Sequence, residues 1–142
     1  MSKSIKALIA AATLATSFAG SASLTPASAF TGGHFPACTE QGVLTYMANR
    51  FVWTDEHVIQ RGLRVDDITH ARKNKYEPAT EMSKIGRRYC QATAWMNDGT
   101  KRKMWYLIEE GMGFAGLGDN VEFCISGLDP WHVYGAWCRS VR

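Results

Sequence analysis

The chain has 142 residues, with 16 basic side chains, 13 acidic side chains and a formal net charge of +3. Lys3 and Lys6 lie in a leading segment that we expect to be removed, which leaves 14 basic and 13 acidic side chains and a net charge of +1. This balance does not favour a nucleic-acid partner. The 113 residues that follow residue 29 suit one domain and are too few for two.

Residues 1–29 have the pattern of a cleaved signal peptide. Lys3 and Lys6 precede an apolar and small-residue run at 7–18, and Ala27-Ser28-Ala29 has the A-x-A form of a cleavage site. The apolar run is shorter than the roughly 20 residues of a membrane-spanning helix. We therefore expect a periplasmic or secreted protein without a membrane span after cleavage, in which residues 30–142 form a single α+β domain.

The four cysteines all follow the predicted cleavage site: Cys38, Cys90, Cys124 and Cys138. An even number in an exported chain indicates two disulfides, and the absence of a C-x-x-C pair argues against a metal site. Pairing Cys90 with Cys124 is disfavoured because an intervening strand would hold them ~10 Å apart. We favour Cys38–Cys90 with Cys124–Cys138, while Cys38–Cys124 with Cys90–Cys138 stays open.

The first predicted element is a helix over residues 40–60. Thr39 is the expected N-cap, and Gly62 is the residue type expected just past the carboxyl end. Val43, Met47 and Phe51 recur at helical spacing and form one apolar face. We expect this amphipathic helix to pack on the rest of the domain.

The strands follow the helix. Residues 63–69 predict a first strand, and the polar residues 70–83 predict a long exposed connection. Residues 87–110 predict a β-hairpin. A glycine-rich loop at 111–119 then leads to a last strand at 121–126 and to an aromatic tail at 131–142, partly helical if Pro130 takes a first helical position.

The hairpin is expected to turn at Asp98-Gly99 through a type I′ turn, in which both residues have positive φ. This register places Trp95 opposite Arg102 as a cation-π pair and Arg88 opposite Glu109 as an ion pair. One face of the hairpin then carries the small residues Cys90, Ala92 and Ala94, where the helix can approach closely. The predicted fold is α+β: an N-terminal amphipathic helix packed on a small antiparallel sheet of three to four strands, with two disulfides.

No sequence pattern assigns a catalytic residue, a metal site or a cofactor. Residues 111–116 read G-x-G-x-x-G, but the dinucleotide-binding motif requires a βαβ unit, whereas this loop leads into a strand. No two histidines are spaced as a local ligand pair, and the nucleophile motif G-x-S-x-G is absent. We therefore favour a protein that is not an enzyme.

Five residues are candidates for partner binding. Met112, Phe114 and Leu117 are apolar residues on the glycine-rich loop, and Trp95 with Arg102 lies on the sheet. The hypothesis is an exported, disulfide-stabilised, non-catalytic binding protein, protein-binding or inhibitor-like, whose partner is a periplasmic or extracellular protein or a glycan. The alternatives are a small hydrolase of envelope polymer, using His132 or His57 with an acid, and a structural component of the cell envelope.

Three segments resemble small exported bacterial proteins: R-Y-C-x-A-x-A-x-M-x-D-G at 88–99, Y-x-I-E-E-G-M-G-F-A-G-x-G-D-x-V-E-F-C at 106–124 and G-L-D-P-W at 127–131. The resemblance covers about residues 38–142. It implies export and a single domain, and it assigns no binding or catalytic residue.

Overall fold

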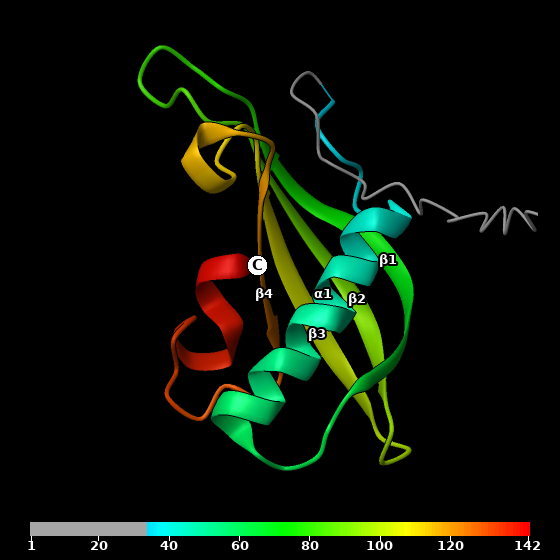
Figure 1. Cartoon of the computed structure of the whole chain (residues 1–142). Coiled ribbons are helices and arrows are strands. Elements are labelled where there is room, and N and C mark those ends of the chain that lie inside the picture. Colours follow the sequence, from blue (N-terminus) through cyan, green and yellow to red (C-terminus); the bar gives the residue numbers. More distant parts are fainter. Residues whose placement is uncertain (1–33) are drawn as a thin grey trace, which may run out of the picture.

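The computed structural model describes residues 34–142, and the predicted signal peptide lies outside them. One helix lies across one face of a four-stranded antiparallel sheet with the order β1-β2-β3-β4 (Figure 1). The elements are α1 (Gln41–Thr54), which continues into a π-helical turn (Asp55–Ile59), β1 (Val65–Glu77), β2 (Arg87–Met96), β3 (Lys101–Glu109) and β4 (Asn120–Ile125), with 3-10 turns at Phe114–Gly116 and Ala136–Val141. None of the helices within 34–142 is long and apolar enough to cross a membrane.

The helix buries the predicted apolar face, but both of its ends differ from the prediction. The N-cap residue is Glu40, not Thr39, and no side chain caps the first turn. At the other end Gln60 has φ 56°, and its N–H donates to the Asp55 carbonyl oxygen at 2.6 Å, which closes the helix with a wider turn. The buried Asp55 carboxylate also accepts the Leu63 N–H at 3.0 Å. The helix end is therefore fixed by Asp55 rather than by Gly62 alone.

Strand β1 is longer than predicted and includes most of the expected connection. It extends to Glu77, so only residues 78–86 connect it to β2. The prediction failed because β1 is an edge strand that is exposed along most of its length. Its charges, such as Arg72 and Lys75, therefore remain in water, and three register shifts against β2 disturb the two-residue alternation.

The hairpin register is shifted by one residue from the predicted one. Only Gly99 in the loop has positive φ, at 79°. Its N–H donates to the Met96 oxygen at 2.9 Å, while the Met96 N–H donates to the Thr100 oxygen at 2.9 Å. This is a three-residue loop with a glycine bulge rather than a two-residue type I′ turn. Trp95 therefore pairs with Lys101, not with Arg102.

The shift changes which side chains of β3 face the helix, because side chains alternate along a strand. Met104 and Tyr106 lie on the helix side, opposite Ala92 and Cys90. The predicted Arg88–Glu109 pair does not form either. Glu109 accepts from Arg87 Nε at 2.9 Å instead, and Arg88 donates to the backbone oxygens of residues 35 and 36.

The core lies between α1 and the small-residue face of the hairpin, as predicted. It joins Val43, Met47 and Phe51 to Ala92 and Ala94, together with residues of β3 and β4. The favoured disulfides are confirmed: Cys38–Cys90 and Cys124–Cys138, with Cα atoms 5.8 and 5.6 Å apart. The first ties the segment before α1 to β2, and the second ties the end of the chain to β4.

The C-terminal segment, residues 127–142, covers part of the other face of the sheet. Cys138 and Val141 pack with Leu107 and Cys124 in a second apolar cluster. Pro130 does not begin a helix. The only helical turns of this segment are at Ala136–Val141, where two residues have left-handed backbone.

Candidate functional site

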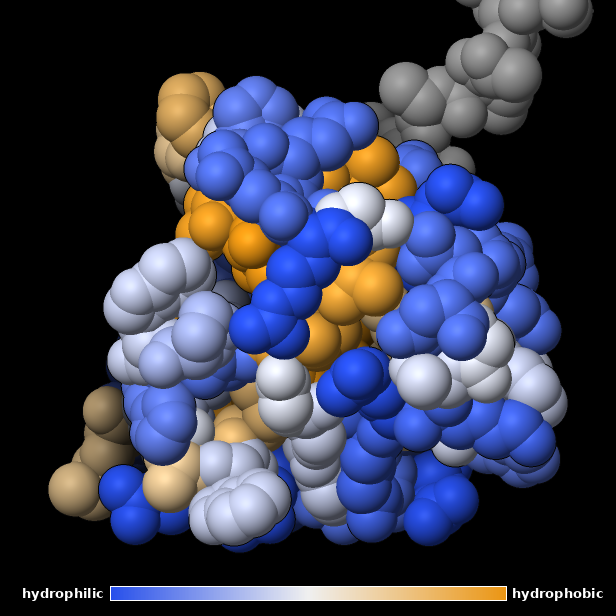
Figure 2. Space-filling view, turned by 90° about the horizontal axis from the view of Figure 1, so that it is seen from below, coloured by the Kyte–Doolittle hydropathy of each residue, from blue (hydrophilic) through white to orange (hydrophobic). Residues whose placement is uncertain are grey.

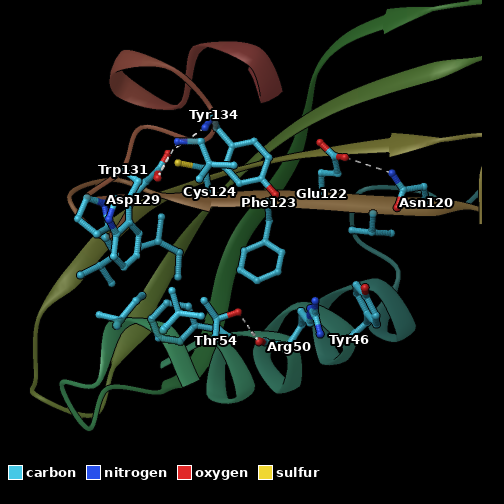
Figure 3. Close-up of a pocket in the computed structure, with 18 residues that line it drawn as sticks. Tyr46, Arg50, Thr54, Asn120, Glu122, Phe123, Cys124, Asp129, Trp131 and Tyr134 are labelled. Atoms are coloured by element: carbon cyan, nitrogen blue, oxygen red, sulfur yellow. Dashed lines mark hydrogen bonds between the residues drawn. The ribbon is translucent and has the colours of Figure 1, made fainter. Parts of the chain in front are cut away.

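A groove of about 360 Å³ runs along β4 between α1 and the C-terminal segment. Figure 3 shows side chains from all three elements converging on this space. The helix side contributes Tyr46, Arg50, Phe51, Thr54, Val58 and Ile59, β4 contributes its six residues, and the C-terminal segment contributes Leu128, Asp129, Pro130, Trp131, Val133 and Tyr134.

The floor of the groove is a free sheet edge, because β4 is the last strand of the sheet. The Ser126 N–H donates to the Lys103 oxygen at 2.9 Å, and hydrogen-bonded pairs alternate along an antiparallel ladder. The peptide groups of Glu122 therefore face β3, while the N–H and C=O groups of Val121 and Phe123 face the groove. No group within residues 34–142 hydrogen-bonds to those two residues from the groove side. The edge presents unpaired donors and acceptors.

The helix forms the inner wall. Phe123 points from β4 toward α1, and Tyr46 and Arg50 point back from the helix (Figure 3). The Arg50 guanidinium lies 4.4 Å from the centre of the Trp53 ring, and within residues 34–142 no carboxylate lies within 4 Å of it. The inner wall thus combines aromatic surface with one positive charge that a ligand can neutralise.

The C-terminal segment forms the outer wall, and Asp129 fixes its shape. The Asp129 carboxylate accepts the N–H groups of Val133 and Tyr134, each at 2.9 Å. Burial raises the pKa of the Tyr134 hydroxyl, and the negative charges of Glu122 and Asp129 raise it further. Tyr134 therefore keeps its proton at neutral pH and can donate a hydrogen bond into the groove.

The lower end of the groove opens on apolar surface. Val58, Trp131 and Val133 expose 43%, 63% and 72% of their area there. Figure 2 views the molecule from the end where α1 finishes, and apolar side chains gather in the middle of this surface, bordered and crossed by hydrophilic ones. Exposed apolar area of this kind is typical of a surface that meets another molecule.

Asp129 and the two histidines considered for hydrolysis do not form a histidine–carboxylate pair within residues 34–142. Both oxygens of Asp129 already accept backbone N–H groups. Of the two histidines considered for hydrolysis, His57 stacks on Trp53 at 4.5 Å between ring centres and its Nδ1 lies 2.8 Å from the Trp53 oxygen. His132 is exposed and borders a smaller hollow beside Cys138. Neither histidine contacts a carboxylate within residues 34–142.

The glycine-rich loop holds its predicted partner-binding residues in solvent. Phe114 and Leu117 expose 95% and 79% of their area, and Met112 exposes 46%. The two ends of the loop are nevertheless joined, because the Gly113 N–H donates to the Gly118 oxygen at 2.9 Å. The backbone segments approach so closely here that a Cβ at residue 113 would lie 2.1 Å from the Leu117 oxygen, which requires glycine. Residue 119 leads directly into β4, so Phe114 and Leu117 lie at the end of the groove where β4 begins.

The five predicted partner-binding residues do not form one site. Trp95 lies near the other end of the sheet from the loop, ~25 Å away along β3 at the usual strand rise. Arg102 faces the helix side, where its Nη1 lies 3.5 Å from the Ser126 oxygen, and Lys101 covers Trp95 instead. A partner role for these residues stays a prediction.

The groove itself was not foreseen, although the sequence contained a signal for it. In a meander of consecutive strands the last strand is an edge, and Val121, Phe123 and Ile125 alternate along it. What the sequence does not contain is the path of the C-terminal segment, which leaves this edge open between two walls.

Comparison of the chain with protein-family models, with curated proteins and with solved structures finds no match. The resemblance to small exported bacterial proteins therefore gains no support from these comparisons.

Proposed function

We propose that this chain is an exported, non-catalytic protein-binding protein that takes up an extended segment of its partner as an additional strand on β4. The observation that carries the proposal is the free edge of β4, where the peptide groups of Val121 and Phe123 face the groove without partners within residues 34–142. An extended backbone is the ligand that satisfies such a row of alternating donors and acceptors.

The walls of the groove give this mode its selectivity. Side chains of an added strand point alternately to the two sides of the sheet. On one side they meet Tyr46, Arg50 and Phe123, and on the other they meet Tyr134 and the disulfide at Cys124. An acidic side chain on the inner side pairs with Arg50, and an apolar one contacts Phe123.

The apolar loop extends this surface beyond the strand edge. Phe114 and Leu117 stand before the first residue of β4, so a partner that follows β4 meets them as it leaves the groove. The two disulfides, Cys38–Cys90 and Cys124–Cys138, suit a protein that works in an oxidising compartment outside the cytosol.

Photo-cross-linking in the cells that produce the protein tests the proposal. A photoreactive residue replaces Val133, which is exposed at the groove, and a second version carries it at Lys84 in the 78–86 connection. We expect a defined protein adduct from position 133 and none from position 84. Absence of any adduct from position 133 would contradict partner binding in the groove.

A pair of substitutions at Val121 tests strand addition specifically. Val121→Pro removes the N–H that faces the groove without removing a hydrogen bond to β3, and proline is tolerated at such edge positions. Val121→Ala keeps the N–H and serves as the control for the lost side chain. We expect the adduct to disappear in the proline variant and to persist in the alanine variant. Equal adduct from both variants would show that the edge is not used.

A further inference from the structure

The face of the sheet that turns away from α1 carries a row of cations independent of the groove. Side chains directly opposite each other in neighbouring strands share a face. By this rule the outer face includes Asp67, Thr69, Arg72, Lys75, Tyr89, Gln91, Thr93, Trp95, Lys101, Lys103 and Trp105. The C-terminal segment packs on Leu107 and Cys124, and Tyr89 and Trp105 border this apolar cluster. The part built from β1, β2 and the first half of β3 stays open.

The cations of this open part have no acidic partners. Within residues 34–142 no carboxylate oxygen lies within 4 Å of the nitrogen atoms of Arg72, Lys101, Lys103 or Arg142. The situation differs at the other end of the same face, where Arg87 pairs with Glu109 at 2.9 Å and Lys75 pairs with a neighbouring glutamate. On this face the cations without a salt bridge therefore lie toward the hairpin end, where the acidic side chain of Asp67 lies opposite Trp95.

Aromatic rings and amides hold these cations in place. Lys101 Nζ lies 3.9 Å from the centre of the Trp95 ring, and Lys103 Nζ lies 4.7 Å from the centre of the Trp105 ring. Trp95 is itself fixed, because its Nε1–H donates to Thr69 Oγ1 at 2.9 Å. With its oxygen turned to Arg72, the Gln91 amide accepts from the guanidinium Nε and Nη2 at 2.9 and 3.0 Å. Positioned cations lose less conformational entropy when they bind an anion.

We propose that this outer face binds an acidic polysaccharide. Lys101 and Lys103 are two residues apart in β3, so their side chains share one face and lie ~7 Å apart at the usual strand rise. They therefore present a row of positive charge rather than a single charge. The neutral polar side chains of Thr93 and Gln91 lie between these lysines and Arg72. A chain of sugars with regularly spaced carboxylate or sulfate groups offers both the anions and the hydroxyl groups that such a surface recognises.

A single-stranded nucleic acid is the other polyanion that could meet this face, and the rings argue against it. Binding of bases depends on aromatic rings that are open for stacking. Here Lys101 covers Trp95, while Lys103 and Arg142 cover Trp105, with the Arg142 guanidinium carbon 5.8 Å from the ring centre. Trp95 still exposes 36% of its area, but a cation lies over each of the two rings, which disfavours the stacking of bases on them.

Binding of the purified protein to polygalacturonate, to heparin, to an oligothymidylate and to neutral dextran tests the proposal over a range of salt concentrations. We expect binding to the two acidic polysaccharides, weaker binding to the oligothymidylate and none to dextran. In Lys101→Gln/Lys103→Gln the slope of log affinity against log salt should fall by roughly 1 to 2, because two anion contacts are lost.

A charge-matched variant separates this face from net charge. Lys73→Gln/Lys84→Gln removes the same two charges from the helix side of β1 and from the 78–86 connection, and its affinity should stay within error of the parent. Equal losses in the two double variants would overturn the proposal, as would tighter binding to the oligothymidylate than to polygalacturonate. Failure to bind either polysaccharide would overturn the proposal as well. None of these outcomes bears on the proposal that a partner strand binds along β4.

Discussion

Removing the two disulfides one at a time should destabilise the domain unequally. The Cys38–Cys90 bond closes a loop with a sequence separation of 52, and Cys124–Cys138 closes one of 14. In the loop-entropy description these lengths correspond to about 4 and about 3 kcal/mol of unfolding free energy. The double variants Cys38→Ala/Cys90→Ala and Cys124→Ala/Cys138→Ala avoid unpaired thiols and give the two contributions separately.

Equilibrium unfolding in urea measures both losses, because the midpoint falls in proportion to the unfolding free energy when the slope is unchanged. The parent protein unfolded with and without reductant supplies the reference. We expect the larger loss in the Cys38/Cys90 variant. Unchanged midpoints in reductant would show that the thiols do not cross-link the folded protein and would refute the reasoning.

The same two variants separate stability from binding. Loss of Cys124–Cys138 releases the outer wall of the groove from β4, whereas loss of Cys38–Cys90 acts on the segment before α1. We therefore expect the Cys124/Cys138 variant to lose the adduct at position 133 although it is the more stable of the two. The opposite ranking would show that the outer wall does not shape the binding surface.

Three smaller changes test the local structure. Tyr106→Phe removes the buried hydroxyl that donates to the Cys38 oxygen at 2.6 Å, and it should lower the unfolding free energy by about 1 to 3 kcal/mol in the same urea assay. Asp55→Ala leaves the N–H groups of Arg61 and Leu63 without their acceptor. We expect the unfolding free energy to fall by about 1 to 3 kcal/mol. Unchanged stability would contradict the role of Asp55 at the helix end. Hydrogen bonds from Thr100 hold the pKa of Asp98 below its usual 3.8. The stabilisation from this carboxylate is therefore present above that value and is lost as the pH falls through the lower pKa of the folded protein. An NMR titration of Thr100→Val should show the Asp98 pKa rising.

The helix and its buried face were predictable because they rest on a local pattern, whereas a simple distance excluded one disulfide pairing and left two, of which the favoured one is present. Val43, Met47 and Phe51 recur at helical spacing, and the strand order alone separates Cys90 from Cys124. These features hold whatever the detailed register of the sheet.

The register of the hairpin was not predictable from Asp98-Gly99, because this dipeptide fits two loops. In a two-residue loop both residues take positive φ, whereas here only Gly99 does and Asp98 accepts the Thr100 N–H at 2.9 Å. One residue of difference moves Arg102 to the helix side and brings Lys101 over Trp95. The predicted pairing of Trp95 with Arg102 failed for this reason alone.

The two edges of the sheet are treated differently, and the difference supports a role for β4. An exposed edge invites pairing with other chains, and proteins commonly prevent it with charges and bulges. Strand β1 has both, in Arg72, Lys73 and Lys75 and in three register shifts. Strand β4 has neither a lysine nor an arginine, and its register against β3 is unbroken from Asn120 to Ile125. Besides its short length and the charge of Glu122, β4 is protected by the pair of walls beside it, which restrict access to a ligand narrow enough to enter the groove. An extended peptide meets that condition, whereas the edge of another sheet with elements packed on both faces does not.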